Sequence, residues 1–144
     1  MPPTKLHRPS GSKRRKPQPT GVHHLAVLVH DLAAAERFYV RVLGLRVIKR
    51  WTDGAGEPRS VWLATGGDVF VAIERAARSG PTRHPQAPGW HCLALAIPPK
   101  ERDRWRARLR RAKVEVARES AYTLYINDPE GNLIGLSHYP VAAA

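Results

Sequence analysis

The chain has 144 residues, of which 42% are hydrophobic, and its 24 Lys and Arg residues against 12 Asp and Glu residues give a formal net charge of +12. This length is typical of one domain, and the hydrophobic content excludes a chain that is disordered throughout. No apolar run reaches the ~18 residues of a membrane helix, and the basic N-terminus lacks the apolar stretch of a signal peptide. The single cysteine, Cys92, cannot form an internal disulfide, so we expect a cytoplasmic protein.

The positive charge is concentrated at the N-terminus. Residues 1–20 contain six Lys or Arg residues, five prolines and no acidic residue. Such a segment cannot bury enough apolar surface to offset the entropy lost on ordering, so we predict a disordered, proline-rich basic arm over 1–20. We predict that the folded domain covers 21–140, followed by a tail at 141–144.

The first half of this domain, 21–79, begins with an apolar run over 24–29 that predicts a buried strand. Asp31 is a good N-cap for a helix whose apolar stripe repeats at helical spacing, and Gly44 is a good helix end. Three more strands are predicted over 45–51, 59–64 and 69–75, separated by glycine-rich turns.

The second half, 89–140, repeats this order after a linker rich in Gly and Pro. A strand is predicted over 90–97, then a helix that starts at Pro98 and Pro99. Strands follow over 114–118, 122–126 and 133–139, the last two joined by a tight turn at 127–132. Neither half can bury its own sheet face, so we expect an α+β fold in which two βαβββ repeats form a curved mixed sheet around a cavity.

The residues of both halves resemble the vicinal oxygen chelate superfamily, which contains glyoxalases, bleomycin-resistance proteins and extradiol dioxygenases. The resemblance rests on the segments 24–32, 36–39 and 42–45 in the first half, and on 89–91 and 128–134 in the second. It implies the glyoxalase-like fold, a small-molecule substrate, and a homodimer whose sites are shared between subunits. It does not indicate which reaction of the superfamily is performed.

Strand alternation turns His24 toward the cavity, with His91 at the equivalent place of the repeat and Glu74 on the corresponding face of the fourth strand. The resemblance places metal ligands at His24, Glu74, His91 and Gly135, with a catalytic role for the carboxylate. Glycine offers no donor where active members carry a glutamate. Two histidines and one carboxylate would suit Fe, Mn, Ni or Zn acting as a Lewis acid.

Two interpretations of this site stay open. In the first, the protein is a metal-dependent lyase, isomerase or dioxygenase. In the second, it is a metal-free binding protein that resembles bleomycin-resistance proteins, and the histidines are polar residues of an empty pocket. Arg59, Trp62 and Tyr125 are candidate substrate-binding residues in either case, although each is equally compatible with a structural place.

The arm and an arginine-rich second helix suggest a third interpretation, a nucleic-acid-associated domain. No zinc finger, helix-turn-helix or RNA-binding signature accompanies them, and a charged outer helix face is usually just solvated. We therefore expect no specific nucleic-acid partner and no membrane partner.

Overall fold

The computed structural model describes residues 16–78, 80–81, 84 and 86–140. The predictions for residues 1–15 and for the tail at 141–144 lie outside the described residues. Residues 16–20 are exposed and form neither helix nor strand. No helix in the described part of the chain is long and apolar enough to cross a membrane.

The first repeat forms β1 (His24–Val29), α1 (Leu32–Arg37), a π-helical turn η1 (Phe38–Val42), β2 (Arg46–Thr52), β3 (Pro58–Ala64) and β4 (Phe70–Arg75). The second forms β5 (Leu93–Ala96), a 3₁₀ turn η2 (Pro99–Glu101), α2 (Arg102–Arg111), β6 (Arg118–Glu119), β7 (Thr123–Asn127) and β8 (Leu133–Ser137). The predicted α+β fold of two βαβββ repeats is confirmed. Asp31 caps α1 as expected, because its side chain accepts a hydrogen bond from the backbone N–H of Ala34.

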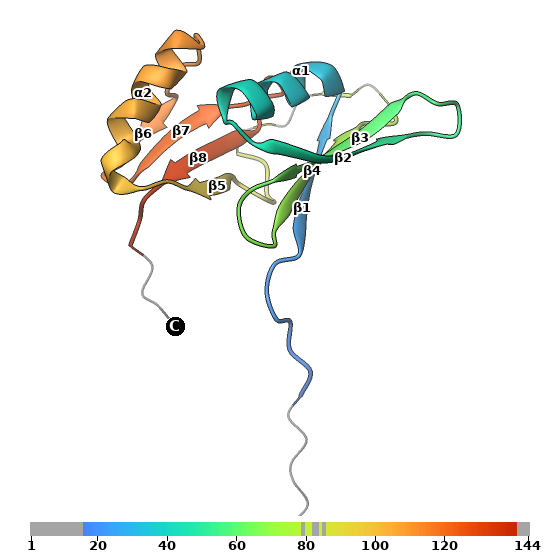
Figure 1. The fold of residues 1–144 in the computed structure, drawn as a ribbon, viewed down its shortest axis with the longest axis horizontal. Coiled ribbons are helices and arrows are strands. Elements are labelled where there is room, and N and C mark those ends of the chain that lie inside the picture. Colours follow the sequence, from blue (N-terminus) through green and yellow to red (C-terminus); the bar gives the residue numbers. More distant parts are fainter. Residues whose placement is uncertain (1–15, 79, 82–83, 85, 141–144) are drawn as a thin grey trace, which may run out of the picture.

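Each repeat forms its own four-stranded mixed sheet. The strand orders are β1-β4-β3-β2 and β5-β8-β7-β6, so the two sheets have the same topology. In each, the first strand runs parallel to the last, and the remaining pairs are antiparallel. Figure 1 shows α1 and α2 along the upper side of the molecule with the sheets below them.

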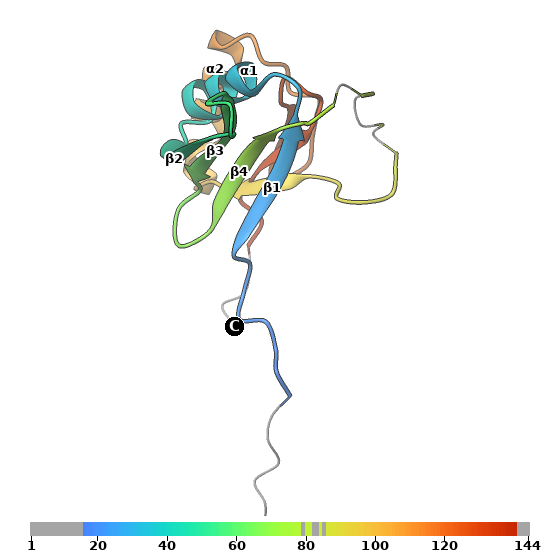
Figure 2. The ribbon, with the colours of Figure 1, turned by 90° about the vertical axis from the view of Figure 1, so that its right-hand side faces the viewer.

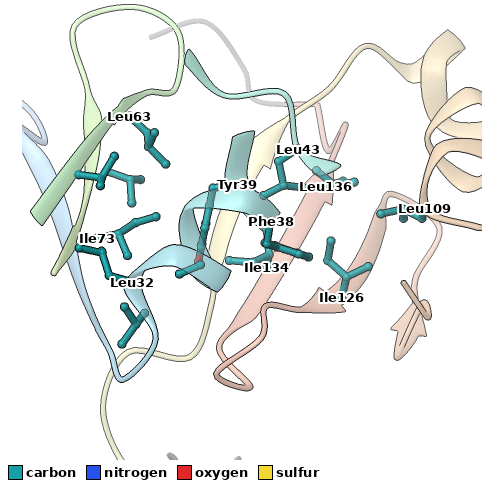
Figure 3. Packing of buried hydrophobic residues seen from close by; sticks show 14 of the residues in the cluster. Leu32, Phe38, Tyr39, Leu43, Leu63, Ile73, Leu109, Ile126, Ile134 and Leu136 are labelled. Carbon is teal, nitrogen blue, oxygen red and sulfur yellow. The ribbon is translucent and has the colours of Figure 1, made fainter. Parts of the chain in front are cut away.

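One continuous core lies between the helices and the inward faces of both sheets. Phe38 and Tyr39 extend from the end of the first helix to the second sheet, where they lie near Ile134 and Leu136 (Figure 3). Tyr39 is completely buried, and its hydroxyl donates a hydrogen bond of 2.9 Å to Asp128. The two repeats therefore share one core, as expected for halves too small to bury their own sheets.

Two predicted strands differ from the structure. The strand expected over 90–97 begins only at Leu93, because its pairing with β8 starts at Leu93 and Ile134. The strand expected over 114–118 is reduced to β6. Lys113 turns the chain with φ of 57° after α2, and Val114 and Val116 then pack on the core without joining the sheet.

Candidate functional site

A row of stacked aromatic rings crosses the outward face of the first sheet. The ring of His24 lies 4.9 Å from that of Phe70 with an interplanar angle of 9°, and Phe70 lies 4.6 Å from Trp62 at 27°. Trp51 continues the row 5.3 Å from Trp62, and the Lys49 ammonium lies 3.7 Å from the centre of the Trp51 ring. Such a surface suits a flat, apolar molecular group.

The outward face of the second sheet carries a different row. Arg118 on β6 pairs with Tyr125 on β7. Tyr125 pairs in turn with Gly135 on β8, and Gly135 pairs with Ala94 on β5. Directly paired residues share a face of the sheet. The residues that alternate with this row along β7 and β8 are buried in the core, namely Leu124, Ile126, Ile134 and Leu136. The row itself therefore faces away from the core.

The Arg118 side chain lies at the β6 edge of this sheet and extends toward His91, which precedes β5 at the opposite edge. Its guanidinium carbon lies 3.9 Å from the centre of the Tyr125 ring, and its Nη2 lies 3.2 Å from Nε2 of His91. Between β7 and β5 lies β8, where Gly135 has no side chain to obstruct the path. A guanidinium can only donate, so Nε2 of His91 is the acceptor in this contact.

Both predicted histidines line a single cleft of about 690 Å³ that runs along β1. Figure 2 shows β1 at the edge of its sheet with β5 crossing behind it. His24 lies at the start of β1, and its Nδ1 is 2.8 Å from Nδ1 of His23. His91 and Cys92 line the same cleft from the segment before β5. A ligand in this cleft can therefore contact both histidines.

The third predicted metal ligand, Glu74, does not lie beside His24. His24 pairs with Phe70, whereas Glu74 pairs with Leu28. Four residues along a strand span about 13 Å, so Glu74 lies too far along β4 to share an ion with His24 of the same chain. Within the part of the chain that the structure describes, no three His, Cys, Asp or Glu side chains form a group that could hold a metal ion.

The candidate substrate residues divide between the faces. Trp62 lies in the aromatic row and Tyr125 lies beneath Arg118. Arg59 alternates with Trp62 on β3, so it lies on the opposite face of the sheet, at the exposed start of the strand. Arg59 and Trp62 therefore lie on opposite faces of the first sheet.

A family model for the Glyoxalase/Bleomycin resistance protein/Dioxygenase superfamily matches residues 21–136. The chain belongs to this superfamily. No curated protein matches its sequence.

Solved structures of superfamily proteins have the same fold. The fosfomycin resistance protein FosX from Listeria monocytogenes is 19% identical, with a TM-score of 0.69 over 86% of this chain and 94% of that one. FosX from Mesorhizobium loti is 17% identical, with a TM-score of 0.67 over 86% and 95%. A glyoxalase/dioxygenase from Nostoc punctiforme is 24% identical, with a TM-score of 0.66 over 85% and 92%. These similarities establish the fold and leave the activity open.

Superfamily members commonly use divalent metals, but the donors of a single chain of this protein do not fit one. At the centre of β4, Ala72 pairs with Ala26, and at the centre of β8, Gly135 pairs with Ala94. Neither residue can supply a carboxylate. The one histidine of the second repeat in the cleft, His91, has its Nε2 occupied by a cation.

Glu130 holds the rim of the cleft; the sequence placed it in a turn and in a segment that carries the family resemblance, without a role of its own. Its carboxylate accepts hydrogen bonds from the backbone N–H groups of His30 and Asp31 and contacts Nδ1 of His30 at 2.8 Å. Nε2 of His30 accepts in turn from the N–H of Gly80. The Asp31 N–H foremost, followed by His30, lowers the pKa of Glu130 below its usual range. The second repeat thus fixes the end of β1.

Sequence reasoning missed Arg118, and the available signal was weak. The predicted strand over 114–118 ended on Arg118, but the face of a strand can be counted only when its pairing is known. Nearby, Glu119 contacts Arg106 and Arg102, and these hydrogen bonds lower the pKa of its carboxyl group. Two arginines of the predicted basic helix therefore serve to hold β6 in place.

Proposed function

We propose that this domain binds a small organic molecule without the help of a metal ion. The observation that carries the proposal is the contact between the Arg118 guanidinium and Nε2 of His91. In this contact the positively charged guanidinium donates an N–H group to Nε2 of His91, the ring nitrogen that a metal ion would otherwise use. Like charges at such a separation repel, so Arg118 disfavours a divalent cation at His91.

The surfaces around the cleft support this proposal. The aromatic row from His24 to Trp51 offers stacking contacts to a planar group. Ligand pockets are mostly apolar with a few placed polar groups. The aromatic row reaches the cleft through His24, and His91, which also lines the cleft, contacts Arg118. The domain then acts by holding its ligand, in the manner of the bleomycin-resistance proteins that the sequence resembles.

A metal-dependent lyase, isomerase or dioxygenase is the second candidate. It is favoured by one observation, that His24 and His91 line the same cleft. Iron, manganese, nickel or zinc would then be held by these histidines, with Glu74 contributed by another copy of the chain. That arrangement requires Arg118 to leave His91.

The test is a thermal-shift screen of the purified full chain against small aromatic compounds, repeated with EDTA, beside metal analysis of the same preparation. We expect ligands that raise the melting temperature equally with and without EDTA, because binding to the native state stabilises it. About one bound metal ion per chain that His91→Ala removes, with ligand shifts abolished by EDTA, would instead establish the second candidate.

A further inference from the structure

Among the residues that the structure describes, no carboxylate pairs with the charge of Arg118. None of the ion pairs formed among residues 16–78, 80–81, 84 and 86–140 involves Arg118. By contrast, Arg102 and Arg106 both form ion pairs with Glu119, the residue that follows Arg118 in the sequence. The two groups that Arg118 does contact are the Tyr125 ring and Nε2 of His91, and neither is a carboxylate.

The guanidinium is nevertheless held in a defined position. The Tyr125 ring lies 3.9 Å from its carbon, and His91 accepts from Nη2 at 3.2 Å. A guanidinium has five N–H donors in a planar fork, so one bond to His91 leaves donors for another acceptor. A fork that is already positioned loses less side-chain entropy when it binds a ligand.

We infer that Arg118, held by His91 and Tyr125, binds the oxyanion of the ligand, a carboxylate or a phosphate group. Two oxygens of a carboxylate or a phosphate match the fork of a guanidinium with two parallel N–H···O bonds. The inference rests on the proposed function and specifies its ligand class. In this chain the arginine contributes the positive charge that a metal ion contributes in metal-dependent relatives.

Gly135 is buried and lies on the same face of the sheet as Tyr125 and Arg118. A Cβ at this position would lie 3.1 Å from Cγ2 of Thr123 and 3.6 Å from Cβ of Ala94, so the sheet surface is flat and closely lined. Ala94 pairs with Gly135 on the same face. An oxyanion that approaches the guanidinium from the outward side therefore meets no acidic side chain in this row.

The experiment is an NMR titration of ¹⁵N-labelled full chain with benzoate, phenylphosphonate, inorganic phosphate and the neutral benzamide. It compares the wild type with Arg118→Gln, Arg118→Lys and, as a matched loss of charge on the exposed end of α2, Arg111→Gln. The signals followed are the Arg118 Nε–H group and the amides of β6 and β7. The amide spectrum also reports whether each variant is folded.

We expect benzoate and phenylphosphonate to shift these signals in the wild type and in Arg111→Gln. Their dissociation constants should rise by about 10- to 100-fold in Arg118→Gln, the value of a hydrogen-bonded charge pair, and less in Arg118→Lys. Benzamide should bind equally to the wild type and to Arg118→Gln. If inorganic phosphate shifts these signals and neither benzoate nor phenylphosphonate does, the site binds a free anion, and the inference of an organic ligand is overturned.

Several outcomes overturn the inference. They are equal affinity of benzoate for wild type and Arg118→Gln, equal effects of benzoate and benzamide on the wild type, and no shift with any anion at millimolar concentration. These results are separate from the test of the proposed function. Chelator-resistant binding of neutral compounds alone would keep the metal-free function and remove the anion site. Chelator-sensitive binding would remove the metal-free function itself.

Discussion

The chemistry of the second sheet depends on one residue without a side chain. Gly135 lies between Tyr125 and Ala94, and the Arg118 side chain reaches His91 across this part of the sheet. The backbone of Gly135 is not in the left-handed region, so other residues can adopt its conformation without strain. The limit on a larger side chain is contact with Thr123, whose Cγ2 must move by a few tenths of an ångström.

Gly135→Glu should remove the binding of organic anions. The new carboxylate would lie on the face of Arg118, pair with its guanidinium and occupy the donors that a ligand needs. The crowding at Thr123 should lower the free energy of unfolding by about 1–3 kcal/mol. Benzoate titration and urea denaturation measure the two effects. Gly135→Ala is the control, since it adds the contact without the charge; equal loss of binding in both variants would contradict the electrostatic explanation.

At the scale of elements, the repeats are joined by side chains that leave one repeat and cap the other. Arg108 on α2 donates hydrogen bonds to the backbone carbonyls of Val42 and Arg41 at the end of η1. Glu130 in the turn between β7 and β8 accepts from the backbone at the start of α1. Because these contacts satisfy backbone groups at helix ends, the first repeat depends on the second for the start of α1 and the end of η1.

Glu130→Gln should make the stability of the protein less dependent on pH. The hydrogen bonds of Glu130 hold its pKa below the usual value, so its ionised form stabilises the folded state. This contribution is complete above the ordinary glutamate pKa of about 4.3 and is lost as the pH falls through the lower folded-state value.

Melting temperatures of the wild type and Glu130→Gln measured from neutral pH to about pH 3 test this prediction. The gap between them should be widest near neutrality and narrow in acid. Glu115→Gln, at an exposed position, is the control and should follow the wild type throughout. If the difference in melting temperature between the wild type and Glu130→Gln stays constant with pH, the ionisation of Glu130 does not contribute to stability, which would contradict this prediction.

The elements were predictable where the signal is local. The apolar run of β1, the cap at Asp31 and the turn before β8 are each set by neighbouring residues, and each is present. The site was harder to predict because it depends on register. His24 was placed on the correct face by alternation, but whether Phe70 or Glu74 lies beside it depends on how β1 pairs with a strand about 45 residues later. Arg118 was missed for the same reason.

The whole molecule leaves apolar groups exposed around the cleft. Leu28 on β1 is 66% exposed and Trp90 before β5 is 82% exposed. The first strand of each sheet also has a hydrogen-bonded strand neighbour on one side only within the described chain. Exposed apolar groups beside free strand edges are typical of a surface that a partner covers. A second copy of this chain would bring another pair of outward faces to the cleft.

We predict a homodimer in solution with its contact along β1 and the segment before β5. Light scattering coupled to gel filtration should give about twice the 16.0 kDa of one chain. The double variant Leu28→Ser, Trp90→Ser should shift the species toward the monomer, whereas Tyr139→Ser, an exposed aromatic beyond β8, should not. A wild type that elutes as a monomer at all concentrations would contradict this prediction.

The missing side chain at Gly135 also has a consequence for how such proteins diverge. Two of the four glycine codons become glutamate codons by a change of a single base. A lineage with glycine here is therefore one mutation from a carboxylate at the centre of the second sheet, and a second mutation at Arg118 would free His91. Two substitutions, one at Gly135 and one at Arg118, therefore separate the proposed anion-binding surface from a surface with a carboxylate at position 135 and His91 free of the arginine.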